Sequence, residues 1–167
     1  RQMIETPIYA INEGASPILS FNYGAGKADN VKKSIKVMMC LVLIYTAVMW
    51  GIIITKPEFI IGIFSSDKTL FKDAVPALKI YFAAFIFMDL QYIGQTVFKS
   101  LNKKKQAIFF SLLRKVIIVA PLTYTLPYVD GVFMAEPISN VIGGSMCFIT
   151  MLATVMPELK RMKNNRI

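Results

Sequence analysis

The sequence predicts an all-α fold, a polytopic membrane bundle of about five transmembrane helices. Of its 167 residues, 55% are hydrophobic and 17% are charged, and the mean hydropathy of +0.54 lies outside the usual range of soluble domains. Uncharged runs of about 20 residues, the length that crosses roughly 30 Å of hydrocarbon, recur along the chain. The basic residues lie between these runs, so connections of unequal charge explain the net charge of +9 better than a nucleic-acid partner does.

The first two expected spans differ in strength. The stretch 1–22 is the weaker, because two glutamates and two prolines interrupt it, and it is allowed only as a helix packed against others. Residues 37–56 form the clearest span, with 19 uncharged residues between flanking lysines. The connection 23–36 separates these spans. The loop 57–78 follows on the opposite side and is expected to contain a short interfacial helix.

The next two spans each carry charges that need an explanation. Residues 79–99 are apolar apart from Asp89 at the centre of the run. Residues 106–128 carry Arg114 and Lys115, and this segment crosses the bilayer only if the pair snorkels or faces protein. We expect the pair to anchor the helix at the cytoplasmic surface rather than to line a pathway.

The last span, 131–157, precedes a polar tail, 158–167. It is apolar except for Glu136. Its adjacent glycines, Gly143 and Gly144, would let a neighbouring helix approach closely.

Lysine and arginine predict the orientation of the bundle. They concentrate in the connections 23–36 and 99–106 and in the tail, whereas acidic residues dilute them in the loop 57–78. By the positive-inside rule the first set is cytoplasmic, which places the C-terminus inside the cell. The first set consists of Lys27, Lys32, Lys33, Lys36, Lys99, Lys103, Lys104, Lys105, Lys160, Arg161, Lys163 and Arg166.

Enzymatic chemistry is not expected. The chain has no histidine, which removes His-dependent triads and the commonest metal ligand. Cys40 and Cys147 lie in apolar runs, where a thiol acts as a small hydrophobe. The chain begins at Arg1 without the pattern of a signal peptide, so we expect a fragment.

Asp89 is the main candidate for a functional residue. A carboxylate at the bilayer centre costs about 2.5 to 3.5 kcal/mol, and an acid kept at that depth can bind sodium, take a proton or pair with a cationic drug. Gln91 and Gln95 lie on or near adjoining faces and would complete a polar patch. The alternative is that Asp89 only accepts hydrogen bonds from neighbouring helices and stabilises their packing.

Asn12 and Glu13 are further candidates for ion coupling. They lie near the cytoplasmic end of the first span, beside Gly14 and Pro17. A helix break at such residues would free backbone carbonyls, which transporters use to hold cations. The alternative is that Glu13 is merely close to the cytoplasmic water.

Aromatic and polar side chains near the outer surface are candidates for a pocket. Tyr81, Phe82 and Phe85 would suit a flat aromatic cation, although an aromatic stripe on a membrane helix more often packs or faces lipid. Glu136 and Asn140 lie near the outer end of the last span, where a structural role is the expected one.

The segment "FNYGAGKADNVKK" is expected to be a cytoplasmic hinge. Its core is Asn22, Tyr23, Gly24, Ala25 and Gly26. A phosphate-binding loop would need a preceding strand and Lys-Ser/Thr in fixed register, and neither is present. We therefore interpret the glycines as a tight turn that the neighbouring lysines hold on the inner side.

Several stretches together resemble one transporter family. They are "EGASPILSFNYGAGKADNVKKSIK", "IFSSDKTLFKDAVPALKIYF", "QTVFKSLNKKKQAIFFSLLRKVIIVAPL" and "YVDGVFMAEPISNVIGG". In order and spacing, over roughly residues 7 to 160, they resemble the C-terminal half of a multidrug and toxic compound extrusion (MATE) transporter. Tyr23 and its neighbours would be part of the family's signature. The orientation derived from the basic residues agrees with the family's.

The resemblance implies a twelve-helix exporter made of two six-helix lobes in the cell membrane. Such a protein couples drug efflux to inward Na⁺ or H⁺ movement by alternating access, and this chain would hold its eighth to twelfth helices. Asp89 would exchange between the coupling ion, as a possible Na⁺ site, and the drug. No cofactor or tightly bound metal is implied. The implied partners are the lipid bilayer, the missing N-terminal helices and small organic cations.

Two alternatives remain at this point. A lipid-linked saccharide flippase of the same superfamily shares the two-lobe plan, but would be expected to have more cationic residues facing a central cavity. A non-transporting structural subunit of a membrane assembly is the other.

Overall fold

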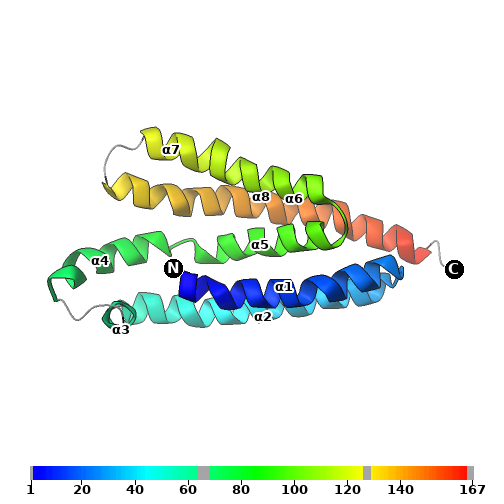
Figure 1. Ribbon diagram of the computed structural model, residues 1–167, viewed down its shortest axis with the longest axis horizontal. Helices are drawn as coiled ribbons and strands as arrows, with labels where there is room; N and C mark the ends of the chain where they lie inside the picture. Colours follow the sequence, from blue (N-terminus) through cyan, green and yellow to red (C-terminus); the bar gives the residue numbers. More distant parts are fainter. Residues whose placement is uncertain (1, 64–67, 126–128, 165–167) are drawn as a thin grey trace.

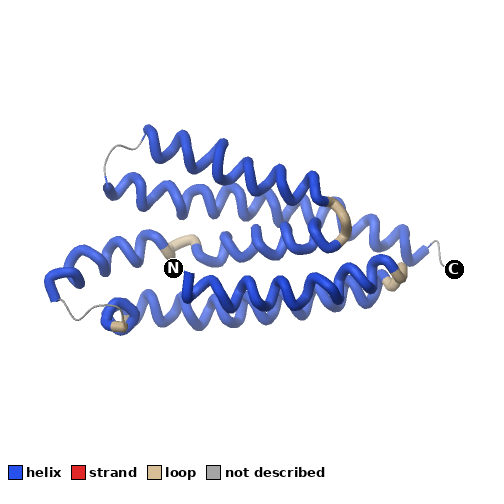
Figure 2. Tube along the Cα trace, in the orientation of Figure 1, coloured by secondary structure: helices blue, strands red, loops and turns tan. Residues whose placement is uncertain are grey.

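The computed structural model describes residues 2–63, 68–125 and 129–164, and every regular element in these ranges is helical (Figures 1 and 2). This confirms the predicted all-α class. In chain order the elements are α1 (Gln2–Gly24), α2 (Ala28–Thr55), α3 (Pro57–Gly62), α4 (Lys68–Tyr81), α5 (Phe85–Ser100), α6 (Lys104–Leu112), the π-helix η1 (Leu113–Val119), α7 (Ala120–Thr125) and α8 (Val129–Asn164).

Helix α5 lies at the centre of the bundle. It packs against α1 and α2 on one side and against α6 and α8 on the other, and the long helices run along the same axis (Figure 1). The α1–α2 turn, the α5–α6 turn and the C-terminus share one end of the molecule, which we call the basic end because most of the lysines and arginines listed above lie there.

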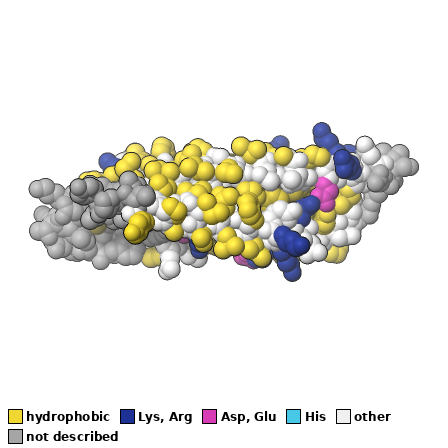
Figure 3. Space-filling view, turned by 90° about the horizontal axis from the view of Figure 1, so that it is seen from above, with side chains coloured by type: hydrophobic (Ala, Val, Ile, Leu, Met, Phe, Trp, Pro, Cys, Tyr) yellow, Lys and Arg dark blue, Asp and Glu magenta, His cyan; other side chains and the backbone are white. Residues whose placement is uncertain are grey.

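The surface of the bundle suits a bilayer. Large apolar side chains such as Leu41, Ile44 and Val48 of α2 are exposed, and apolar groups cover the middle of the face in Figure 3 while basic groups gather toward the basic end. Among the described residues, three helical segments are long and apolar enough to cross a membrane. A fourth candidate is the pair α4–α5, bent by 43°. Helix α1, the weakest candidate by sequence, does not pass the same test.

The connections are shorter than the sequence predicted. Only 25–27 separate α1 from α2, so most of the expected loop 23–36 is helical, and α3 with most of α4 occupies the expected loop 57–78. Helix α8 likewise continues to Asn164, into the expected tail. Lysine is a good helix former and can extend its ammonium group to water from within a helix. Basic residues therefore indicate where a segment reaches the membrane surface and not where its helix ends.

Two expected straight spans are distorted. Residues 82–84 interrupt the run 79–99, between α4 and α5. Residues 113–119 of the run 106–128 form the π-helix η1, a local widening that is frequent at functional sites. Arg114 and Lys115 both lie in this widened segment.

Close contact with α8 holds α5 in place. A Cβ atom added to Gly144 would lie 1.9 Å from the backbone oxygen of Phe87, and one added to Gly94 would lie 2.9 Å from Cys147 Sγ. Only glycine fits at the first of these positions, because backbone atoms cannot move aside as a side chain can. The predicted close approach of a helix at Gly144 is therefore confirmed, and the approaching helix is α5.

Candidate functional site

Asp89 lies on α5 and is fully buried, with 0% of its surface exposed. The hydroxyl of Thr46, on α2, donates a hydrogen bond to its Oδ2 atom. Its other oxygen, Oδ1, has no hydrogen-bond partner among the described residues. The carboxyl group therefore has one oxygen held and one open, in surroundings closed to water.

Two polar residues near Asp89 were missed by the sequence reasoning. Thr46 stands in the middle of the clearest apolar run, where nothing marks it as a partner for an acid on another helix. Glu5, on α1, is also buried and acts electrostatically on Asp89. The available signal was only that each is a polar residue within an expected span.

The expected patch of Asp89, Gln91 and Gln95 is split by the helix. Residues two apart on an α-helix point in different directions. Asp89 meets Thr46 of α2, whereas the Nε2 atom of Gln91 donates to the Phe110 carbonyl at 3.4 Å. Gln91 and Gln95 line a separate cavity that does not include Asp89.

This cavity, which we call the polar cavity, has a volume of about 710 Å³. Glu5 and Tyr9 of α1 line it together with Gln91 and Gln95 of α5. The opposite wall consists of residues from α6, η1 and α8. They include Ser111, Arg114, Lys115 and Glu136. Several separate segments of the chain therefore meet around one polar space.

Arg114 points into the protein instead of anchoring the helix at the surface. It is 5% exposed, and its Nη1 atom donates to Asn140 Oδ1 at 2.5 Å and lies 4.0 Å from Glu136 Oε1. The anchor expectation is wrong for this residue, because a carboxylate and an amide on α8 compensate the buried charge. The structure thus brings together Arg114, Glu136 and Asn140, which were separate candidates in the sequence.

The expected aromatic pocket does not coincide with the polar cavity. Phe82 and Phe85 are buried and stack edge to face at 5.0 Å, with Tyr81 at 5.4 Å from Phe82. These rings pack the bend between α4 and α5. The aromatic pair on the cavity wall is instead Tyr9 and Tyr92, whose rings are 4.8 Å apart and whose hydroxyls are hydrogen-bonded at 2.6 Å.

The helix break expected beside Asn12 and Glu13 is absent. Helix α1 is continuous past Gly14 and Pro17. Glu13 is exposed and forms an ion pair with Lys99 at 2.8 Å. Asn12 is buried, donates to the Ile8 carbonyl at 2.9 Å and leaves its own Oδ1 without a partner among the described residues.

The segment around Asn22–Gly26 ends α1 in a tight turn. Gly26 has a φ of 67°, a conformation that favours glycine, and Lys27 N–H closes the turn on the Asn22 carbonyl at 2.8 Å. The Asn22 side chain accepts a hydrogen bond from Asn30 at 3.1 Å across the turn. The expected tight turn at the glycines is therefore present, and its role as a hinge stays a prediction.

Tyr23 connects this turn to α8 and the α5–α6 turn. Its hydroxyl donates to Glu158 Oε1 at 2.5 Å, and Lys103 lies 2.7 Å from Glu158 Oε2. The hydrogen bond to Glu158 raises the pKa of Tyr23 to about 12. Partial burial would raise the pKa of Glu158, but the hydrogen bonds from Lys103 and Tyr23 outweigh it and lower that pKa below its ordinary value.

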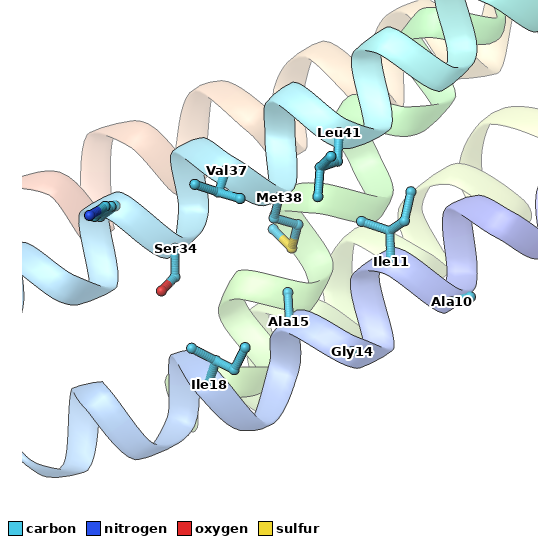
Figure 4. A pocket seen from close by; sticks show the side chains of 10 residues that line it. Ala10, Ile11, Gly14, Ala15, Ile18, Ser34, Val37, Met38 and Leu41 are labelled. Atoms are coloured by element: carbon cyan, nitrogen blue, oxygen red, sulfur yellow. The ribbon is translucent and has the colours of Figure 1, made fainter.

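A second concave region lies on another face of α1 and is apolar. This groove of about 410 Å³ runs between α1 and α2. Figure 4 shows Ile11, Ala15 and Ile18 facing Val37 and Met38 across it. Such a lining offers dispersion contacts to apolar chains and no acid, so it is not a candidate for ion coupling.

Comparison with known proteins identifies the family to which this chain belongs. The family described as MatE matches residues 2–125, well over half of the chain. The chain belongs to the MATE family. This membership confirms the resemblance drawn from the sequence, and the family is one of multi-pass membrane transporters and not of enzymes.

The relatives are longer than this chain. The multidrug export protein MepA of Staphylococcus saprophyticus is 24% identical over 156 residues, which cover 92% of this chain and 34% of the relative. A FAD transporter of Shewanella oneidensis is 20% identical over 144 residues, 84% of this chain and 32% of the relative. The chain therefore spans about a third of the length of these relatives.

Solved structures of the family match the fold. The MATE multidrug transporter DinF-BH, in complex with the dye rhodamine 6G, has a TM-score of 0.84 at 25% identity, over 92% of this chain and 35% of that one. A MATE structure in the straight conformation has a TM-score of 0.84 at 12% identity, over 96% and 37% of the two chains.

Proposed function

We propose that the complete protein is a cation-coupled multidrug efflux antiporter that exports organic, often cationic, compounds by alternating access. This chain would supply the eighth to twelfth helices, and the basic end would face the cytoplasm. The observation that carries the proposal is the buried carboxyl group of Asp89, with one oxygen held by Thr46 and the other without a partner among the described residues.

The open oxygen explains why a cation would bind here. A buried carboxylate oxygen without a partner is costly. Either a proton on Oδ1 or a Na⁺ ion held by Asp89 and the Thr46 hydroxyl would remove that cost. Because Asp89 lies on the helix that contacts α1, α2, α6 and α8, a change in its charge would act on the packing of the whole lobe.

The proposal is tested by Asp89→Asn in the full-length protein. We expect loss of rhodamine 6G efflux from cells together with normal membrane insertion. Asp29→Asn is the matched control, because Asp29 is exposed at the basic end and pairs with Lys163 at 2.9 Å. Undiminished efflux from cells carrying Asp89→Asn would overturn the assignment.

The cavity also bears on the flippase alternative. Two cationic side chains, Arg114 and Lys115, line it beside two acids, Glu5 and Glu136. Among the residues that line the cavity, cations are therefore not in the excess expected of a lipid-linked saccharide flippase. One relative is named as a FAD transporter, so similarity alone leaves the charge of the cargo open.

A further inference from the structure

We propose that the polar cavity selects aromatic substrates that carry a carboxylate, and that Lys115 is the residue that recognises it. The inference rests on the proposed function, since it takes the polar cavity to be part of the substrate pathway. It adds a substrate class, compounds with an acidic group beside a flat ring, to the cationic compounds expected from the sequence.

Lys115 carries a charge that no described residue neutralises. Lys115 lines the cavity and is an exposed residue. Within 2–63, 68–125 and 129–164, no hydrogen bond or ion pair engages its ammonium group. It lies eleven residues after Lys104, where α6 begins, which is roughly 16 Å along the helix at about 1.5 Å per residue. A helix that crosses a hydrocarbon core of roughly 30 Å places such a residue near the middle of the core. A cation at that depth marks a water-filled path or a ligand.

The other charges of the cavity are already engaged. Arg114 is held by Asn140 and Glu136. Glu5 makes an interaction of its own. Among the described residues, neither acid forms an ion pair with Lys115, so its ammonium group is open to a substrate carboxylate.

The remaining wall suits an aromatic acid. The paired rings of Tyr9 and Tyr92 border the cavity. Gln91 is 3% exposed, and its Oε1 atom and the Nε2 atom of Gln95 are buried without hydrogen-bond partners among the described residues. Leaving such atoms unpaired is costly, and rotation of either amide toward the cavity would let a ligand satisfy them. The volume of about 710 Å³ falls within the usual range for ligand pockets, roughly 300 to 1,000 Å³.

A matched pair of dyes tests the inference. Rhodamine 6G is an ethyl ester, and its free acid keeps the same cationic ring system but exposes a carboxylate. Binding of each dye to the full-length protein in lipid nanodiscs would be measured by fluorescence polarisation. We expect the free acid to bind about tenfold more tightly than the ester, the factor that one charge-assisted hydrogen bond supplies.

Three variants make the assignment specific to Lys115. We expect Lys115→Gln to bind both dyes equally and Lys115→Arg to keep the preference for the acid. Lys104→Gln changes an exposed lysine at the start of α6 and outside the cavity, so it should keep the preference as well.

Three results would overturn the inference. The first is equal affinity of the wild type for the two dyes. The second is a preference for the free acid that persists in Lys115→Gln. The third is an equal loss of affinity for both dyes in Lys115→Gln, which would show that Lys115 has a structural role. The assay needs no ion gradient, so its failure is distinguishable from failure of the Asp89 efflux test.

Discussion

Asp89 and Gln91 lie two residues apart on α5, yet their surroundings are opposites. Asp89 is enclosed by α1 and α2 and meets one hydroxyl, that of Thr46. Gln91 borders a cavity of about 710 Å³ lined by charged groups from α1, η1 and α8. The first site offers one carboxylate oxygen without a partner among the described residues, and the second offers a cavity of drug-molecule size. One helix therefore separates the proposed coupling site from the proposed binding site.

This separation shows how ion and substrate could be linked without sharing ligands. Helix α5 contacts elements on both sides, so a shift driven by protonation or Na⁺ binding at Asp89 would move one wall of the polar cavity. Allosteric coupling of this kind requires two sites and one element whose position both sites bias.

The largest effect is expected where α5 meets α8. Gly144→Ala would place a Cβ atom 1.9 Å from the Phe87 carbonyl oxygen, and we expect it to destabilise the protein by about 3 kcal/mol through overpacking. The fall in melting temperature in detergent measures this. Gly51→Ala is the control, since nothing lies within 4 Å of a Cβ atom there. Equal melting temperatures for the two variants would contradict the packing described.

A smaller effect is expected on the Asp89 side. Thr46→Val removes the hydroxyl that bonds Asp89 and keeps the shape of the side chain, so the efflux rate should fall about tenfold, in line with the loss of one buried hydrogen bond to a charged group. Thr46→Ser should restore most of the rate. Equal efflux rates for Thr46→Val and Thr46→Ser would show that the Thr46 hydroxyl does not influence Asp89.

The smallest effect is expected at the basic end, away from both sites. Glu158 has a lowered pKa in the folded protein, so its stabilisation is complete above its ordinary pKa of 4.5 and is lost as the pH falls through the folded value. Glu158→Gln should cost about 1 kcal/mol or less at neutral pH. Thermal unfolding of both proteins between neutral and acidic pH should show their difference shrink toward low pH. A stability difference that grew as the pH fell would contradict the lowered pKa of Glu158.

The helical class and the position of the buried acid could be predicted from the sequence, because apolar runs of membrane length and a lone charge within one of them are visible without a structure. The hydrogen-bond partner of that acid could not be predicted. Thr46 is 43 residues away, and only the packing of α2 on α5 brings the two together.

Other differences have a similar cause. Arg114 was expected at the surface because its compensating groups, Glu136 and Asn140, belong to a helix that follows later in the chain. The polar cavity combines residues from α1, α5, η1 and α8, and no local pattern encodes such a meeting. The split between Asp89 and Gln91, in contrast, follows from helical geometry alone.

The most direct test of two separate sites is to measure efflux and binding in the same Asp89→Asn protein. Full-length wild type and variant would be reconstituted in proteoliposomes for ion-driven efflux of rhodamine 6G and in nanodiscs for equilibrium binding of the same dye. The account predicts that the variant loses efflux and still binds the dye, but with an affinity that no longer responds to pH or Na⁺. The wild-type affinity should respond by about fivefold or more, the coupling of about 1 kcal/mol or more that linkage between two sites requires. Retained efflux, or binding lost together with efflux, would contradict it.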